Sequence, residues 1–416
     1  MSTTAVLAFE NPVGVPLRTK LERVERRRKL MAFALVLPLL LFILITFVLP
    51  LGRMMLNAVH DDTLQSLMPR TTAALGTWDG KDLPDERAFS ALAEDLKRAW
   101  AQKTVGKIGV RVNYELPGAA SQIRSSAREA NEISDGPYKA ALIAINPLWG
   151  QNDIWGVLKR GGSSFTGFYL LRSIDLEYDA QSRIVALPPE NAIFRNVFLR
   201  TLVISIGVTT ATLLLAFPLA YLLATLPPKT SNLLMIIVLL PFWVSVLLLT
   251  TAWVVLLQDH GLINETLMAL HVLSEPGKLL YNRVGTVLAM THIQLPFTLL
   301  PIYSVMKSIS PNHIRAARSL GAGPFYAFWK IYFPQCLPGI AAGCLLTFIL
   351  CLGYYITPAL VGGPNDQMIS NFVALYTNQE LNWGMASALG AILLTATLLL
   401  YNVFNKLVGA DRVKLG

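Results

Sequence analysis

Six uncharged runs, each long enough to cross a bilayer, constrain the fold of this 416-residue chain more than any other feature. A helix needs about 20 apolar residues to span roughly 30 Å of hydrocarbon. Only 15% of the residues are charged, against about 25% in soluble domains. The sequence therefore predicts an all-α membrane protein with six transmembrane helices. The runs are Leu30–Gly52, Thr201–Pro228, Thr230–Gln258, Val284–Met306, Ile331–Asn365, with its span at Leu337–Ile356, and Leu381–Asn405.

The distribution of basic residues predicts which side of the membrane each segment occupies. Seven Lys and Arg lie in residues 1–29, directly before the 23-residue run Leu30–Gly52. That run is too long for the apolar region of a signal peptide, about 7–15 residues, so we expect an uncleaved first span. Placing both termini inside gives the inner segments 15 basic and four acidic residues, and leaves 20 basic and 22 acidic elsewhere. The pattern predicts a multi-pass membrane protein with cytoplasmic termini, and its basic excess requires no nucleic-acid partner.

A mixed-charge stretch between the first two spans predicts one folded, outward-facing domain, here called the insert (residues 53–193). Ala88–Gln102 has the period of an amphipathic helix, whereas Ile108–Leu116 and Phe168–Leu187 alternate as strands do, so we expect an α/β domain. Its four tryptophans are interpreted as core residues: Trp78, Trp100, Trp149 and Trp155. The predicted divisions are a cytoplasmic segment 1–29, a first helix 30–52, the insert 53–193, a five-helix core 194–408 and a cytoplasmic tail 409–416.

The spans lack the residues that would supply energy or catalysis. They contain no Asp, Glu, Lys or Arg, which ion-coupled transporters keep at mid-membrane, and His292 is interpreted as facing a neighbouring helix. The chain contains no G-x-x-x-x-G-K-[ST] phosphate loop. No metal-ligand spacing or catalytic motif is present, and Cys336, Cys344 and Cys351 are interpreted as small apolar residues. We expect a chain that is not an enzyme, binds no cofactor and receives its energy from a partner.

The loop from Lys307 to Pro334 is where such a partner would act. Ser310 can cap a helix that begins at Pro311, and Gly321 suits the left-handed residue that ends it. Gly323-Pro324 would open a second segment that stops at Pro334. A first helix of about ten residues is too short to be stable alone, so it needs a partner surface.

The spacing in this loop resembles the E-A-A-x3-G-x9-I-x-L-P loop of ABC importer permeases. Arg315-Ala316-Ala317 is followed at the matching distances by Gly321, Ile331 and Phe333-Pro334. The departures are Arg315 for the usual Glu and Phe333 for the usual Leu. In that family the loop is the coupling helix, which sits in a groove of a cytoplasmic ATPase. The resemblance implies that the residues coupling to the ATPase are Arg315, Ala316, Ala317, Arg318, Gly321 and Ala322.

A second set of matches, from about Phe194 to Lys406, resembles the polyamine (spermidine/putrescine) branch of these permeases. By family, the complete machine would hold a pair of cytoplasmic ATPases that bind ATP and Mg²⁺, a second permease subunit, and a periplasmic substrate-binding protein. The matching segments are P-L-A-Y-L-L-A (218–224), L-L-P-F-W-V-S (239–245), L-Q-D-H-G-L-I-N (257–264), L-P-F-T-L-L-P-I-Y-S-V-M (295–306), G-Y-Y-I-T-P-A-L-V-G-G (353–363) and W-G-M-A-S-A-L-G (383–390).

Aromatic residues in these segments are candidates for the substrate path, because aromatic faces attract ammonium groups. The candidates are Trp243, Trp253, Tyr354 and Tyr355, with Asp259 at the outer mouth. The alternative is that the rings anchor helices at the headgroups or pack in the bundle. Gly339-x-x-x-Gly343 in the fifth span predicts a close helix contact.

The functional hypothesis is a permease subunit of an ATP-driven importer for polyamines or a related organic cation. Alternatives are an importer of another small solute (an opine, an amino-acid derivative or an iron chelate), a secondary transporter, and a membrane sensor with an outward ligand domain. The four spans beyond the two that flank the insert disfavour the sensor, and the uncharged spans disfavour the secondary transporter.

Overall fold

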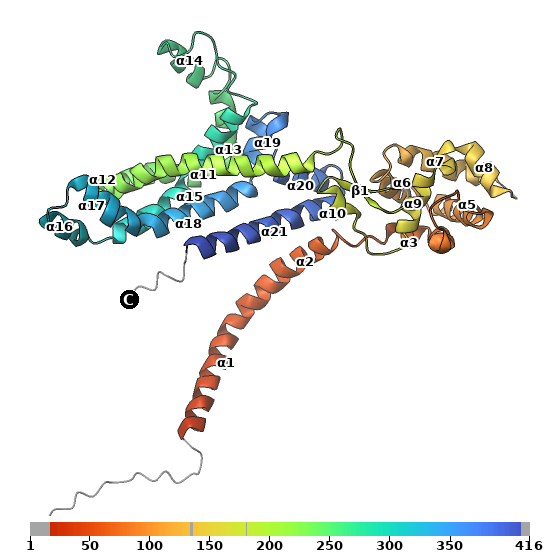
Figure 1. The fold of residues 1–416 in the computed structure, drawn as a ribbon, viewed down its shortest axis with the longest axis horizontal. Helices are drawn as coiled ribbons and strands as arrows, with labels where there is room; N and C mark the ends of the chain where they lie inside the picture. Colours follow the sequence, from red (N-terminus) through yellow and green to blue (C-terminus); the bar gives the residue numbers. More distant parts are fainter. Residues whose placement is uncertain (1–16, 134–135, 180, 409–416) are drawn as a thin grey trace, which may run out of the picture. The chain divides into compact units, whose positions relative to one another are not determined.

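The computed structural model describes residues 17–133, 136–179 and 181–408 (Figure 1). Residues 1–16 of the predicted N-terminal segment and the whole predicted tail 409–416 lie outside the described residues. The chain divides into two compact units, Met1–Leu56 and Asn57–Gly416. Each unit is considered by itself.

The described part of the first unit is one long helix, charged at its start and apolar from Leu30 to Gly52. It runs as α1 (Leu17–Ile43), a π-turn over Leu44–Val48 and α2 (Leu49–Leu56). Its section Val24–Leu56 is long and apolar enough to cross a membrane, and it contains the predicted run 30–52. The predicted first run therefore forms one continuous helix.

The second unit supplies four more continuous helices that meet the same length and composition test. In these largely apolar helices the backbone satisfies its own hydrogen bonds, as hydrocarbon requires. They are α11 (Phe194–Thr225), α15 (Arg283–Ser308), the helix Pro324–Leu352, and α21 (Trp383–Val408).

The run Thr230–Gln258, expected to form one span, is a bent pair of helices. Helix α12 (Pro228–Leu239) and a short 3₁₀ turn (Leu240–Trp243) are followed by α13 (Val246–Leu256), and the two parts meet at 99°. Pro241 cannot donate a backbone hydrogen bond, and Val244 and Ser245 adopt extended backbone between the parts. The structure thus has five continuous candidate spans among its described residues, or six with this pair counted as one.

Three of the long helices form the centre of the second unit, with α15 packed against both α11 and α18 (Phe333–Leu352). At Gly343 an added Cβ would lie 2.5 Å from the Thr298 carbonyl oxygen. At Gly339 it would lie 2.9 Å from Val305. The close contact predicted from the Gly-x-x-x-Gly pattern is therefore confirmed, because only glycine lets the two backbones approach this far.

Hydroxyl groups join the same three helices inside the bundle. Thr298 donates to Thr212 of α11 at 3.0 Å and therefore accepts from Thr347 of α18 at 2.6 Å. All three side chains are fully buried. The hydroxyl groups thus satisfy each other's hydrogen-bonding capacity at a depth that neither water nor lipid headgroups reach.

Shorter helices connect the long ones. They are α14 (Leu262–Ala269), α16 (Pro311–Ser319), α17 (Pro324–Ala327), α19 (Ile356–Val361), a 3₁₀ turn (Pro364–Asp366) and α20 (Ile369–Asn378). The predicted stop at Pro334 is wrong. A π-turn over Phe328–Tyr332 carries α17 directly into α18, and its wider ring makes room for a proline that lacks an N–H.

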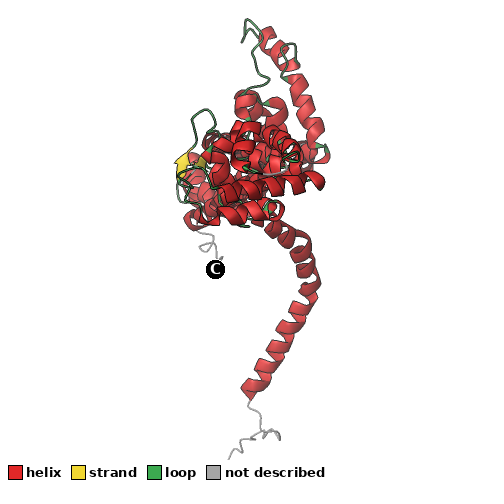
Figure 2. Cartoon of the chain, turned by 90° about the vertical axis from the view of Figure 1, so that its right-hand side faces the viewer, coloured by secondary structure: helices red, strands yellow, loops and turns green. Residues whose placement is uncertain are grey.

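The insert is mainly helical, as Figure 2 shows. Among the described residues of the insert, one hairpin pairs β1 (Leu176–Tyr178) antiparallel with β2 (Ile184–Ala186). Phe89, Trp149 and Trp155 lie fully buried at the centre of its core, with ring centroids 4.6 Å apart for Phe89 and Trp155. Its helices are α3 (Thr63–Leu67), α4 (Pro69–Ala74), α5 (Glu86–Ala101), α6 (Val105–Asn113), α7 (Ala119–Ala130), α8 (Tyr138–Ile145), α9 (Asn152–Arg160) and α10 (Phe168–Arg172).

The α/β fold predicted for the insert is not confirmed, because strands are few among its described residues. The amphipathic helix expected over 88–102 is confirmed as α5, but the strand expected over 108–116 is wrong. Those residues belong to α6, where Val105, Ile108 and Val112 share one buried face. The helix is favoured because Gly109 lets α7 approach: an added Cβ would lie 3.2 Å from the Ala120 carbonyl oxygen. Of 168–187, only the two three-residue strands are extended as predicted.

Candidate functional site

The loop after α15 forms the predicted helix and turn. The Ser310 hydroxyl accepts from the Asn312 amide at 3.3 Å, and Pro311 is the first helical residue. Gly321 has φ of +89° and its amide donates to the Arg318 carbonyl at 3.0 Å. Serine cap and left-handed glycine therefore define the two ends of α16, as the sequence indicated.

Most of the surface of α16 is open. The six coupling candidates lie on α16 and the turn after it; Ala317 and Ala322 are partly buried and the other four are exposed. Leu320 and Phe325 beside them are 89% and 77% exposed. Within the described residues no carboxylate lies within ion-pair distance of Arg315 or Arg318. The surface thus combines small, basic and apolar groups that have no partner in the described chain.

The five candidates for the substrate path do not form one cluster. Trp243 and Tyr355 are 73% and 41% exposed, and Asp259 lies exposed in the loop after α13. Tyr354 instead packs against Met290. Trp253 belongs to a different cluster of buried residues: Leu257, Ala289 and Val361. The structure brings α13 and α19 together through Thr250 and Thr357, whose buried hydroxyls lie 3.0 Å apart.

A contact between Trp253 and His292 was not foreseen from the sequence. The indole N–H of Trp253 donates to Nδ1 of His292 at 3.1 Å, with the rings edge to face at 5.7 Å. His292 therefore does contact a neighbouring helix, as interpreted, but its ring remains exposed on the surface of α15.

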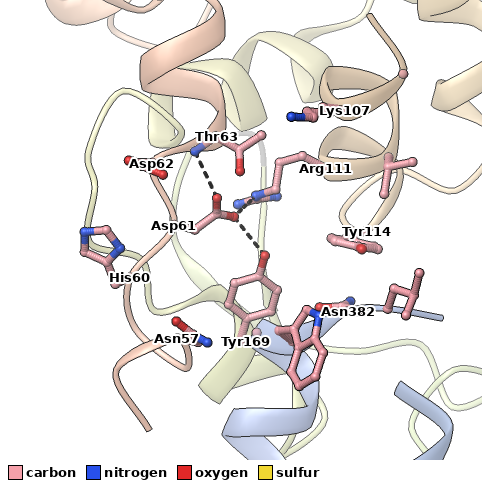
Figure 3. A pocket seen from close by; sticks show the side chains of 15 residues that line it. Asn57, His60, Asp61, Asp62, Thr63, Lys107, Arg111, Tyr114, Tyr169 and Asn382 are labelled. Carbon is pink, nitrogen blue, oxygen red and sulfur yellow. Dashed lines mark hydrogen bonds and ion pairs between the residues drawn. The ribbon is translucent and has the colours of Figure 1, made fainter. Parts of the chain in front are cut away.

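A cavity of about 550 Å³ was also missed by sequence reasoning (Figure 3). It lies where the loop before α3, helix α6, Tyr169 of α10 and the loop before α21 meet. No local pattern links these segments, so the sequence carried no signal for it. Its polar lining includes Asn57, His60, Asp61, Asp62, Lys107, Arg111, Tyr114 and Asn382.

A buried ion network forms one wall of this cavity. Asp61 accepts from Arg111, from the Tyr169 hydroxyl at 2.8 Å and from the Thr63 amide at 3.1 Å. Arg111 also donates to Glu115 at 2.9 Å, and Glu115 accepts from Arg160 at 2.8 Å. Asp61 and Arg111 thus satisfy each other and stabilise the wall, leaving the exposed Asp62 and Lys107 at the mouth (Figure 3).

The network changes the acidity of its members. Burial acts to raise the pKa of Asp61, but the Arg111 guanidinium and the hydrogen bonds from Thr63 and Tyr169 hold it below its usual 3.8. Burial raises the pKa of the Tyr169 phenol well above its usual range. For Arg111, burial opposes the charge, but Glu115 and the other anionic neighbours hold its pKa above the usual range. The carboxylate, phenol and guanidinium forms are therefore the stable ones at neutral pH.

Comparison with known proteins places these features in a family. Residues 216–412 match the family described as binding-protein-dependent transport system inner membrane component. The spermidine/putrescine transport system permease protein PotB of Haemophilus influenzae is 31% identical over 221 residues, which cover 52% of this chain and 77% of that protein. The inner membrane ABC transporter permease protein YdcU of Escherichia coli is 34% identical over 291 residues, covering 65% and 89%.

Among solved structures, a bacterial alginate ABC transporter in complex with an alginate-bound periplasmic protein is similar at 19% identity and a TM-score of 0.43. That likeness covers 54% of this chain and 80% of the other. The sequence relatives carry the assignment, because the identity extends over most of their length. The chain belongs to the binding-protein-dependent inner membrane components, the permease subunits of ABC transporters, and within them resembles the spermidine/putrescine branch.

Proposed function

We infer that this chain is one permease subunit of an ATP-driven importer for polyamines or a related small organic cation. The observation that carries the inference is the 31% identity to a spermidine/putrescine permease over 77% of its length. The chain has no phosphate-binding loop of its own, so ATP and Mg²⁺ would bind to a pair of partner ATPases on the cytoplasmic side. A second permease subunit and a periplasmic binding protein would complete the importer in the inner membrane, with both termini of this chain cytoplasmic.

Helix α16 is the proposed contact with the ATPase. Its open surface of Arg315, Ala316, Arg318 and Gly321 supports this, because small residues let a partner backbone approach and arginines can pair with carboxylates. When ATP draws the two ATPases together, the attached α16 helices would move with them. That movement would shift the bundle between inward-open and outward-open packings.

Passage through the permease needs only weak contacts, because the binding protein would supply affinity. Each aromatic face attracts an ammonium group by about 0.5–2 kcal/mol, which permits release. The exposure of Trp243 and Tyr355 supports a role for these two rings in the path. Trp253 and Tyr354 are more embedded, so they would act from the wall of the path.

Transport in proteoliposomes tests the function. The vesicles contain this chain, a second permease and the ATPase pair, and the binding protein is added to them. They should accumulate labelled spermidine or putrescine only when ATP is present on the side of the membrane where the ATPases lie. An ionophore that collapses ion gradients should leave uptake unchanged. Uptake that needs a gradient instead of ATP would indicate a secondary transporter, and ATP-driven uptake of an anion but no cation would overturn the cargo assignment.

A further inference from the structure

His292 is a polar group on an otherwise apolar surface of the bundle. On α15 it follows Val284 and Leu288 at intervals of four residues, and these two are 58% and 43% exposed. The opposite face of α15, with Met290 and Thr298, is fully buried. His292 therefore points away from the three-helix centre.

Lipid is a poor neighbour for this face. A polar ring in hydrocarbon without a hydrogen-bond partner costs free energy. The bend beside it is a second sign: Val244 and Ser245 leave the helical path, and Ser245 is exposed. The 3₁₀ turn before the bend lies against α15, with the rings of Phe242 and Phe297 4.8 Å apart. Irregular backbone at membrane depth is tolerated where it lines an aqueous cavity or is covered by protein.

The contact with Trp253 determines what His292 can offer. An indole N–H can only donate, so Nδ1 of His292, which accepts it at 3.1 Å, must carry a lone pair. No acidic residue lies in 230–258 or 284–306 to stabilise a second proton. The neutral ring then carries its single proton on Nε2 and presents an N–H donor to the open face.

We propose that His292 lines the substrate path as a hydrogen-bond donor fixed by Trp253, and that the cargo is an organic cation which also carries an acceptor such as a carbonyl. This inference rests on the transport function proposed above and narrows its cargo. An ammonium group has donors and no lone pair, so a plain diamine cannot accept from Nε2–H. A carbonyl, carboxylate or hydroxyl group on the cargo can. His292 is the contact residue and Trp253 its positioning residue.

The test compares two cargoes of one chain length, putrescine and N-acetylputrescine, in the complete reconstituted importer. The measured quantity is the ratio of ATP-driven uptake of N-acetylputrescine to that of putrescine, with one binding protein throughout. Trp253→Phe keeps an aromatic ring but removes the indole N–H that holds the lone pair on Nδ1 of His292. The ring proton can then lie on Nδ1, and Nε2 can offer a lone pair to an ammonium group. We expect this variant to lower the ratio by about fivefold, the effect of one net hydrogen bond. His292→Phe should lower it by loss of uptake of the acetylated compound.

Trp100→Phe is the matched control, since this exposed tryptophan of the insert lies outside the proposed path and makes no contact with His292, and its ratio should equal that of wild type. An unchanged ratio in Trp253→Phe and His292→Phe, with uptake intact, would overturn the inference and leave the transport function standing. Equal loss of both cargoes together with loss of the second permease on purification would assign His292 to a subunit contact and also overturn it. A wild-type importer that transports neither of these compounds nor spermidine would contradict both proposals. Nitrogen-15 NMR of the labelled histidines gives an independent reading, in which His292 should be protonated at Nε2 only.

Discussion

The ring of Tyr169 occupies the space where Gly384 has no side chain. A Cβ added at Gly384, at the start of α21, would lie 2.4 Å from that ring, well inside van der Waals contact. The Tyr169 hydroxyl meanwhile donates to Asp61 at 2.8 Å. One tyrosine of the insert thus contacts both the last long helix and the ion network beside the cavity.

Gly384→Ala should destabilise the protein through this contact. The added methyl must displace the buried ring of Tyr169, and overpacking of this kind costs about 1–3 kcal/mol. The measurement is thermal unfolding in detergent, with Gly390→Ala as the control, because Gly390 lies on the same helix with nothing within 4 Å of its Cβ position. Equal midpoints for the two variants would show that Tyr169 can move aside freely.

Arg111→Met should be more harmful. The substitution removes the cation that Asp61 and Glu115 share, and both buried carboxylates lose this partner. Removing one member of a buried ion pair lowers the free energy of unfolding by about 3–5 kcal/mol. Lys107→Met, an exposed position on the same helix, removes the same charge without touching the network. The free energy of unfolding of each variant, compared with wild type, checks the expectation. A similar small loss in both would mean that the pairing contributes little.

The low pKa of Asp61 predicts an acid-sensitive contribution to stability. Because its folded pKa lies below the usual 3.8, the carboxylate stabilises the folded state fully at pH above about 4. That stabilisation is lost as pH falls through the folded pKa. The difference in thermal unfolding midpoint between wild type and Asp61→Asn should be constant from pH 5 to 8 and should shrink below about pH 4. Its size should be on the order of that expected for the loss of one buried ion pair. A difference that does not change with pH would show that Asp61 is not ionised in the folded protein.

Gly321→Asp should separate the permease from its ATPase. The site has open space on this chain, so an added side chain projects outward and would hold a partner's backbone away. Gly321→Ala is the control: it brings the same left-handed strain, about 1 kcal/mol, with little bulk and no charge. Co-purification of the ATPase and substrate-stimulated ATP hydrolysis are the measurements. We expect the aspartate variant to lose most of both and the alanine variant to keep them, and normal coupling in the aspartate variant would contradict the proposed docking.

Arg315→Glu should weaken the same assembly if the partner's groove presents a carboxylate. Like charges repel more strongly in a partly buried groove than in water. Lys330→Glu changes the charge of the same loop equally, at an exposed position outside α16. Retention of the ATPase during a salt gradient compares the two. If both variants assemble as wild type does, Arg315 is merely solvated.

Local chemistry explains what could be predicted. Crossing a membrane depends on the length and apolarity of a single run, and both can be read from neighbouring residues. The caps of α16 behave in the same way, since Ser310 and Gly321 act on atoms two to three residues away. The spacing from Arg315 to Pro334 could predict a coupling loop for the same reason, because the motif is contained in one short segment.

Tertiary contacts decided the rest. Alternation in 108–116 favoured a strand, yet α6 forms because α7 lies against Gly109, and no single segment contains that information. Asp61 and Arg111 are 50 residues apart, and Trp253 and His292 are 39 apart. In each pair the residue types were visible in the sequence, but their roles depend on which atom of a distant segment completes the hydrogen bond. The sequence by itself determined the long apolar helices and the two ends of α16, because hydrophobic length and capping are local properties. Only the fold determined the cavity, the ion network and the donor state of His292, because burial and hydrogen-bond partners come from segments that meet in space.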